Sequence, residues 1–453
     1  MSEKDKTILI VVLAVVAVFG CFIISCCAAT MLVVSHTGRD TFINVLNESI
    51  YDDTVAYVKN IDGELTEAEQ LIIEKTEKVR GLSVENKLAP VYETEDELRE
   101  YMIEQLDDVT DEEFEDELGL YKILGFAPDG FDLRQFYIDM YSEQIAGFYD
   151  PDENKMFLIE DDSDYNNAVT LAHEYTHYLQ YNTPMFDKAL KHDDDFCEDN
   201  GEYCVIMDAI VEGDATLTES LTDVDSIIGM YWSLSDDYYS SESSVFDNAP
   251  KFFRESLLFP YSAGYDFVSY HYLRGGFDKV NDLYLNFPQS VEQIMHPEKY
   301  LKDEPVTVTL EPFRSMIEDE FDIVNEDVMN ESDIKMLLSC GYDESWQLSD
   351  RQAAAGADGW GGGQFIFAEE DDKPLFFAKI VWDTVDDAKE AESAFIQYSD
   401  KRFGKQIEAN VWNGEDDAVV YLIRQDDVLY WMILPDTFES APLLNILVHG
   451  SAL

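Results

Sequence analysis

The stretch LAHEYTHYLQ, Leu171 to Gln180, places two of the chain's seven histidines four residues apart, with a glutamate beside the first. The apolar residues of this stretch recur at helical spacing, which predicts an amphipathic helix. Residues four apart on a helix face the same way, so His173 and His177 can offer ring nitrogens to one ion. The alternative is two histidines on a helix face that does not pack into the core.

A second helix, predicted over VIMDAIVEGDATLTESL at 205–221, supplies a third donor. Its core stripe includes Ile206 and Ile210 and leaves Glu212 offset from the core. The adjacent Gly213 permits close approach of another helix. Two histidines and a glutamate are a standard ligand set of catalytic zinc, so we expect a Zn²⁺ ion on these three residues. Glu174 would be the general base for a water that zinc activates.

The motif order HEYTH, VEGDA and PYSAG resembles the gluzincin superfamily of zinc peptidases and a group of exported prokaryotic proteins. In gluzincins the third ligand is a glutamate on the following helix, which corresponds to Glu212. PYSAG is similar to the PYxxG helix of the zinc aminopeptidase and leukotriene-hydrolase group, whose tyrosine donates a hydrogen bond to the tetrahedral intermediate. The matching position is Tyr261, and His296 in MHPEKY is a competing donor.

The chain departs from this resemblance in two places. It lacks the Gly-x-Met-Glu-Asn signature with which the aminopeptidases grip a free N-terminus, so endopeptidase activity is favoured. Many gluzincins orient a histidine with an aspartate four residues after the ligand glutamate, where this chain has Thr216, which leaves Asp214 as a candidate. The strand AGFYD, ending at Asp150, resembles the edge strand that pairs with extended substrate in gluzincins; an ordinary packing hairpin is the alternative.

The overall charge excludes one class of partner. Ninety-five Asp and Glu residues against 30 Lys and Arg give a formal net charge of -65, which would repel a nucleic acid. Acidic residues occur along the whole chain after the N-terminal apolar run, which indicates a hydrated surface suited to high salt. The loop KHDDDFCEDNGEYC could hold Ca²⁺, although its spacing fits no EF-hand and a solvated acidic loop is the alternative.

The N-terminal run from Ile8 to Val34 contains no charged residue and is long enough to span a bilayer as a helix. An uncleaved anchor with the body outside the cytoplasm is favoured, and a lipoprotein or a cleaved signal peptide are the alternatives. Cys197 and Cys204 bracket a short acidic segment, so export predicts a local disulfide between them, with a pair of free thiols as the alternative.

The expected fold class is α+β, with an N-terminal transmembrane helix, a mainly helical gluzincin-type domain carrying a small β-hairpin or sheet, and a small C-terminal α+β domain. The hairpin turns at Pro151 to Asn154. The C-terminal strands are expected at FIFA, LFFAKIVWDT, AVVYLIRQ and VLYWMILP, with a helix between the second and third. The predicted divisions are a membrane anchor at 1–36, a charged helical stalk or prodomain-like segment at 37–125, a metallopeptidase domain at 126–302 and an α+β domain at 303–453.

These patterns together predict a membrane-anchored zinc peptidase that acts on peptide or protein substrates outside the cytoplasm. A catalytically silent zinc-binding adaptor and a salt-adapted structural surface protein are the alternatives. The intact Glu174 argues against the adaptor, since a structural zinc site has no use for a base. The sequence does not indicate an oligomeric state.

Overall fold

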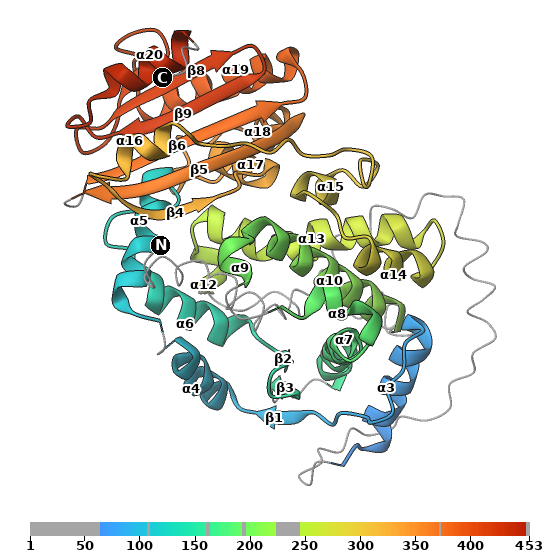
Figure 1. Ribbon diagram of the computed structural model, residues 1–453. Helices are drawn as coiled ribbons and strands as arrows, with labels where there is room; N and C mark the ends of the chain where they lie inside the picture. The colour runs from blue at the N-terminus through green and yellow to red at the C-terminus, as the bar shows by residue number, and fades with distance from the viewer. Residues whose placement is uncertain are drawn as a thin grey trace.

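The computed structural model describes residues 64–106, 109–159, 164–192, 196–222, 245–370 and 373–449. Within these parts the chain is α+β, with helices and two separate sheets. One sheet belongs to the C-terminal part at the top of Figure 1, and the other lies among the N-terminal elements below it.

A group of helices builds the core below the large sheet in Figure 1. Its apolar side chains, including Leu171, Ile210 and Phe267, form one buried cluster. The long helices of this group are α3 (Glu67–Arg80), α7 (Asp164–Tyr181), α10 (Gly201–Thr222) and α13 (Lys251–Tyr272). The shorter elements are η3 (Pro184–Phe186), α8 (Asp187–Leu190), α9 (Phe196–Asp199), α14 (Phe277–Leu285) and α15 (Val291–Met295), whereas α12 (Val245–Asn248), just before α13, has no buried residue.

A three-stranded sheet lies beside α7. It consists of β1 (Val91–Glu93), β2 (Gly147–Asp150) and β3 (Lys155–Ile159) in the order β1-β3-β2. Strand β1 runs parallel to β3, and β2 runs antiparallel to it. The turn predicted between β2 and β3 is present, and the Asp150 carboxylate closes it by accepting from the backbone N–H groups of Asp152 and Glu153. Strand β2 is an edge strand of this sheet.

The large sheet has six antiparallel strands in the order β4-β5-β6-β9-β8-β7. The four strands expected from the sequence are β5, β6, β8 and β9, and the short edge strands β4 and β7 extend the sheet. Their bounds are β4 (Asp322–Asp327), β5 (Trp360–Glu370), β6 (Lys373–Trp382), β7 (Val411–Asn413), β8 (Val419–Gln425) and β9 (Val428–Leu434).

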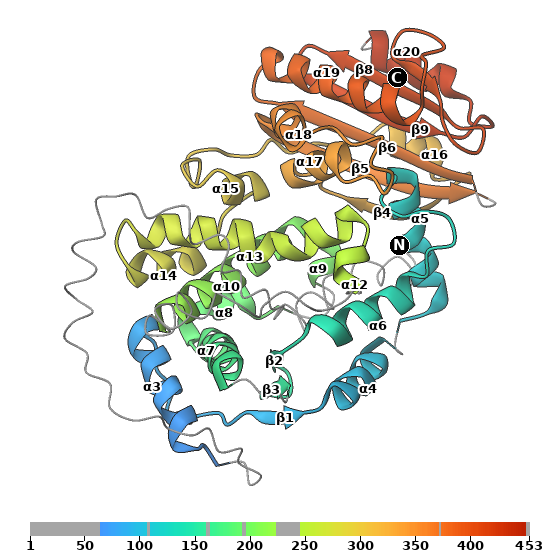
Figure 2. The ribbon, with the colours of Figure 1, turned by 180° about the vertical axis from the view of Figure 1, so that it is seen from behind.

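Helices cover both faces of this sheet (Figure 2). One face packs against α17 (Glu331–Ser339), α18 (Asp350–Ala357) and α19 (Val385–Arg402), and the other against α16 (Phe313–Ile317) and α20 (Ser440–His449). Successive side chains of β5 and β6 point to opposite faces of the sheet. Phe376 therefore lies in the core under α17, α18 and α19, and Phe377 lies in the core under α16 and α20.

Three N-terminal helices add side chains to the core that contains Phe376. They are α4 (Glu95–Leu106), α5 (Asp111–Leu124) and α6 (Leu133–Gln144). Helix α5 approaches the sheet at Gly119, where a Cβ atom would lie 3.0 Å from the Phe367 ring. The Tyr398 hydroxyl of α19 donates to the Leu124 carbonyl at 3.2 Å. The described part of the segment expected as a stalk therefore packs against both α7 and α10, through α3, and the C-terminal sheet, through α5.

The transmembrane helix in the expected fold class requires a correction. Within the described residues no helix is both long enough and apolar enough to cross a bilayer. Charged residues interrupt the apolar runs of the long helices; α10, for example, is mostly buried but carries Glu202, Asp208 and Asp214. The span expected at Ile8 to Val34 lies outside the described residues.

Candidate metal centre

Helices α7 and α10 hold the centre between them. They run antiparallel, because contacts that advance along α7 from His173 to Gln180 step back along α10 from Glu219 to Val211. The imidazole rings of His173 and His177 lie 4.8 Å apart, centroid to centroid, and nearly perpendicular. Both residues are buried, with 7% and 4% of their surface exposed, so they face the protein interior.

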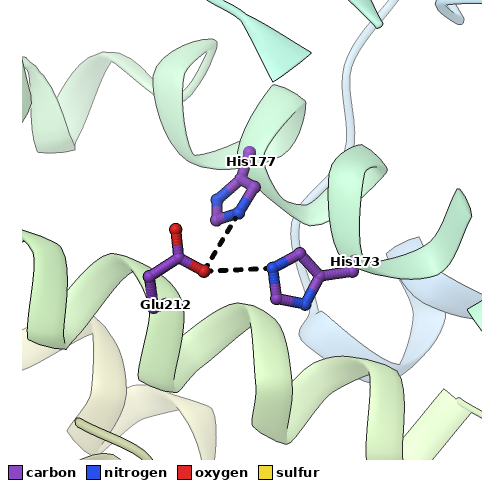
Figure 3. A group of neighbouring side chains, drawn as sticks. All are labelled: His173, His177 and Glu212. Atoms are coloured by element: carbon purple, nitrogen blue, oxygen red, sulfur yellow. Dashed lines mark hydrogen bonds and ion pairs between the residues drawn. The ribbon is translucent and has the colours of Figure 1, made fainter. Parts of the chain in front are cut away.

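The third residue of the centre, Glu212, points between the two imidazole rings (Figure 3). Its Oε2 atom lies 3.1 Å from His173 Nε2 and 3.5 Å from His177 Nε2. Tetrahedral zinc with bonds of about 2.1 Å would hold its ligand atoms about 3.4 Å apart. His177 Nε2 is also buried and has no hydrogen-bond partner in the described chain. These three residues form a group that could hold a metal ion.

The outward nitrogen of each histidine is fixed by a second residue. His173 Nδ1 lies 2.8 Å from Glu219 Oε2, and His177 Nδ1 lies 2.8 Å from Gln180 Oε1. A carboxylate or amide oxygen can only accept, so both Nδ1 atoms carry the proton. The Nε2 atoms of the neutral imidazoles then present lone pairs to the centre. Neither Glu219 nor Gln180 was predicted from the sequence.

Asp214, the candidate for orienting a histidine, acts on His177 through Gln180. Gln180 Nε2 donates to its Oδ2 at 3.1 Å, so the chain of contacts runs from His177 through Gln180 to Asp214. Arg80 Nε lies 2.8 Å from the Asp214 carboxylate, and the Tyr284 hydroxyl donates to it at 2.9 Å. Asp214 and Arg80 are fully buried, so α3 supplies the charge that neutralises this aspartate.

Without a metal, the histidines and carboxylates of the centre shift one another's pKa values. Burial opposes protonation of His173 and His177, but the carboxylates of Glu219 and Glu212 outweigh it, so the pKa of both imidazoles is raised, that of His173 well above its ordinary value. Burial likewise opposes the charge of Glu212, and the two histidines overcome it and lower the pKa of this carboxyl. The metal-free centre is therefore a buried ion pair whose imidazole protons a metal would replace.

Two further predicted residues lie at the centre. Glu174 follows His173 on α7 and is 1% exposed, and its charge contributes to the raised pKa of His177. The Tyr261 ring lies 6.3 Å from the His173 ring, centroid to centroid, with an angle of 27° between the planes. Tyr261 is on α13, so three helices contribute to the centre.

The position of α13 depends on two glycines. A Cβ atom on Gly213 would lie 2.3 Å from the Gly264 carbonyl oxygen, and one on Gly264 would lie 2.0 Å from the Ala209 carbonyl oxygen. Only hydrogen fits at both positions, which confirms the prediction that Gly213 permits close helix approach. This contact brings Tyr261 of α13 toward the ligands on α10 and α7.

His296 does not join this centre. Its Nε2 atom lies 2.9 Å from Glu331 Oε1, at the first residue of α17. The preceding helix α15 contacts the start of α10, because the Val291 N–H donates to Glu202. Glu202 precedes Glu212 by ten residues, which is about 15 Å along a helix axis. His271, to which the sequence assigned no role, is buried between Phe267 and Tyr300.

The acidic loop before α10 contains the predicted disulfide, because Cys197 and Cys204 are bonded. Residues 193–195 of the expected Ca²⁺ loop lie outside the described residues. Among the described residues, the groups that could hold a metal include none from this loop. The bond ties α9 to the first turn of α10, the helix that carries Glu212.

Comparison with known proteins gives one match. A family model described as a domain of unknown function, DUF8575, matches residues 316–440. The match covers the large sheet with α17, α18 and α19, and it contains no residue of the metal centre. No curated protein and no solved structure matches the chain. The fold and the site thus define an α+β protein with a buried His, His and Glu group that could hold a metal ion.

Proposed function

We propose that the protein is a zinc-dependent peptidase that acts outside the cytoplasm. The convergence of His173, His177 and Glu212 in one buried group, with Glu174 beside it, carries this proposal. Two histidines and a glutamate are a ligand set of catalytic zinc, and three protein ligands leave a fourth position for water or substrate. A purely structural site normally fills all four positions with protein ligands, and it needs no base.

The chemistry of a bound zinc ion would be Lewis-acid polarisation of a carbonyl and activation of water near neutral pH. His173, His177 and Glu212 would hold the ion. Glu174 takes a proton from the attacking water and delivers it to the leaving amine, which is general base and then general acid catalysis. Tyr261 donates a hydrogen bond to the oxygen that gains negative charge during attack.

Substrate backbone is proposed to pair with β2. This strand is at the edge of its sheet and next to α7, the helix that carries both histidines. The edge of a sheet offers backbone donors and acceptors to an extended peptide whatever its sequence, and the buried residues of β2 would have to be uncovered for this pairing. Recognition of extended backbone suits cleavage within a chain, so we favour endopeptidase activity.

The location outside the cytoplasm is supported by the disulfide between Cys197 and Cys204. Disulfides persist in oxidising compartments and are rare where thiols are kept reduced. Cys340, the free cysteine among the described residues, is buried, so it is shielded from thiol exchange with this bond.

The deciding experiment compares the wild-type chain with Glu174→Gln and His177→Ala. We expect Glu174→Gln to keep the zinc of the centre and to lose cleavage of an unfolded protein by about 10²- to 10⁴-fold, because only the base is removed. His177→Ala should lose both the metal and the cleavage. Zinc content by mass spectrometry and product release by chromatography give the two measurements.

Glu100→Gln is the matched control, since Glu100 is an exposed carboxylate on α4 and the chemical change is the same. It should retain full cleavage. Zinc binding without cleavage in the wild type would favour the silent adaptor. Equal cleavage by the wild type and Glu174→Gln would refute the role of Glu174, and loss of zinc in Glu174→Gln would mean that this residue is structural.

A further inference from the structure

A second group of metal-ligating residues lies where the metal-bearing helices meet the C-terminal part. His296 ends α15, Glu331 begins α17, and Asp358 follows α18. One ligand atom from each lies within 4.8 Å of the others. The nitrogen nearest to the carboxylates is His296 Nε2, which lies 2.9 Å from Glu331 Oε1.

The Glu331 carboxylate is only half satisfied. The residue is 2% exposed, and its Oε2 atom is buried with no hydrogen-bond partner in the described chain. A buried carboxylate oxygen without a donor is costly, because it has lost its water and gained nothing in exchange. Glu331 therefore has an unused ligand atom in the same carboxylate that contacts His296.

A neighbouring group of three carboxylates, in contrast, is paired with a lysine. Glu292, Asp303 and Asp383 surround the Lys299 ammonium, whose Nζ atom lies 2.5 Å from the first and 3.5 Å and 3.4 Å from the others. That group already holds a cation of the chain itself. Within the described residues, Glu331 forms no ion pair with Lys or Arg, and its charged partner is His296 alone.

We propose that His296, Glu331 and Asp358 bind a second divalent transition-metal ion of the zinc class. One imidazole nitrogen and two carboxylate oxygens are ligands that zinc accepts, and the exposure of Asp358 leaves room for water as a fourth ligand. The three residues come from α15, α17 and the end of α18. The ion therefore joins α15 to α17 and α18, two of the helices that cover the large sheet.

The test uses the full chain carrying His173→Ala and His177→Ala, which removes the first centre. We expect this variant to retain a single equivalent of zinc in equilibrium dialysis, and zinc to raise its melting temperature. Adding His296→Ala should weaken this binding by more than the roughly 10- to 100-fold that the loss of an outer contact costs, since a ligand itself is lost. The dialysis involves no cleavage, so its result is independent of the proposed peptidase activity.

Two further variants guard against misfolding and against nonspecific binding. Asp358→Asn changes an exposed residue after α18 and should weaken zinc binding while leaving the circular dichroism spectrum unchanged. His192→Ala removes a histidine that belongs to neither group and should leave zinc binding unchanged. Absence of zinc from the His173→Ala/His177→Ala variant, or zinc that survives His296→Ala, would overturn the proposal and leave His296 and Glu331 as an ion pair only.

Discussion

Glu219 fixes His173 from two helical turns beyond the ligand Glu212. It lies seven residues after Glu212 on α10, so both carboxylates face α7, one toward His173 Nε2 and the other toward Nδ1. Without a metal, the two carboxylates together favour the imidazolium, which is protonated at both ring nitrogens; with a metal on Nε2, Glu219 keeps the proton on Nδ1. At His177, the neutral amide oxygen of Gln180 accepts from Nδ1. The two histidines therefore differ in the charge of the group that contacts Nδ1.

Replacing Glu219 with alanine should weaken zinc binding by about 10- to 100-fold, the usual cost of losing a contact behind a metal-ligating histidine. Glu219→Gln keeps an oxygen that can accept from Nδ1 and should recover part of the loss. Competition with a chelating dye measures both affinities. Equal affinity in Glu219→Ala and the wild type would show that Glu219 does not position His173.

Zinc affinity should rise with pH through the neutral range. The pKa values of His173 and His177 are raised, so below those values each imidazole carries a proton that zinc must displace. Above them no proton is displaced, and the affinity should level off. Titration calorimetry in buffers of different protonation enthalpy would report proton release on binding. Binding without proton release at pH 6 would contradict the ion-paired state of the metal-free centre.

At the scale of elements, the contact between α5 and α6 buries a carboxyl group. Glu117 is 3% exposed and accepts hydrogen bonds from the Tyr121 and Tyr137 hydroxyls, both at 2.8 Å. Burial raises its pKa to about 7, although the two hydroxyls oppose this shift. A group that is more basic in the folded state stabilises the fold only while it is protonated.

The contribution of Glu117 to folding stability should therefore fall as the pH rises from about 4.5 through 7, and Glu117→Gln should remove this part of the pH dependence. A shift from 4.5 to about 7 corresponds to on the order of 3 kcal/mol. Urea unfolding at pH 5 and pH 8 should show the variant close to the wild type at the lower pH and more stable at the higher pH. Glu100→Gln, on an exposed site, should reproduce the wild-type profile. An unchanged difference between the two pH values in Glu117→Gln would refute the prediction.

The crossing of α10 and α13 is the second test at this scale. Gly→Ala inside a helix normally stabilises by about 1 kcal/mol. At Gly264 the new Cβ atom would lie 2.0 Å from the Ala209 carbonyl oxygen, so we expect destabilisation by about 1–3 kcal/mol instead. Displacement of α13 should also move Tyr261 and lower cleavage. Ser262→Ala, at an exposed position of the same helix, is the control for the melting temperature. A stabilised Gly264→Ala variant would mean that the helices do not touch there.

At the scale of the whole molecule, the contact between Arg80 and Asp214 joins residues 134 positions apart. The Arg80 guanidinium also lies over the Phe277 ring, 4.8 Å from its centroid. Arg80→Leu would keep an apolar side chain in this place but leave the Asp214 charge buried without its partner. We expect a loss of about 3–5 kcal/mol of stability, measured by urea unfolding.

The double variant Arg80→Leu/Asp214→Asn should recover part of that stability, because no unpaired charge remains. It should still bind zinc more weakly than the wild type, since Gln180 loses a charged acceptor. If removal of the Arg80 charge instead raised cleavage, α3 would be an inhibitory segment that covers the centre, contrary to its place in the core.

The three candidate ligands could be predicted because helical periodicity puts His173 and His177 on one face, and because Glu212 is offset from the core stripe of its helix and matches the third-ligand position of the gluzincin motif order. Glu219 and Gln180, which contact the Nδ1 atoms of the histidines, could not be predicted. Whether Glu219 or Thr216 faces a histidine depends on the register between α7 and α10, which is a matter of tertiary packing and leaves no local pattern in the sequence. Thr216 lies on the same helix, yet its hydroxyl has no hydrogen-bond partner in the described chain.

The strands were predictable where the alternation of apolar residues was strong, as in β5, β6, β8 and β9. Strand β4 has the sequence DIVNED, in which polar residues outnumber apolar ones, and β7 has three residues. Both are edge strands, whose partial exposure weakens the apolar signal. The packing of α5 on this sheet had no local signal, because its partners lie more than 200 residues further along the chain.

The distance in sequence between α5 and the parts that pack on it determines which contacts can form first during synthesis. A chain that emerges from its N-terminus presents Leu124 long before Tyr398, so α5 must wait for the sheet and α19 that will pack on it. The residues of the candidate metal centre, in contrast, are complete at residue 212, and α13, which packs against α10, ends at Tyr272. A metal ion could therefore bind before the larger core closes. Until then, the apolar side chains of α5 that belong to that core stay uncovered by the sheet.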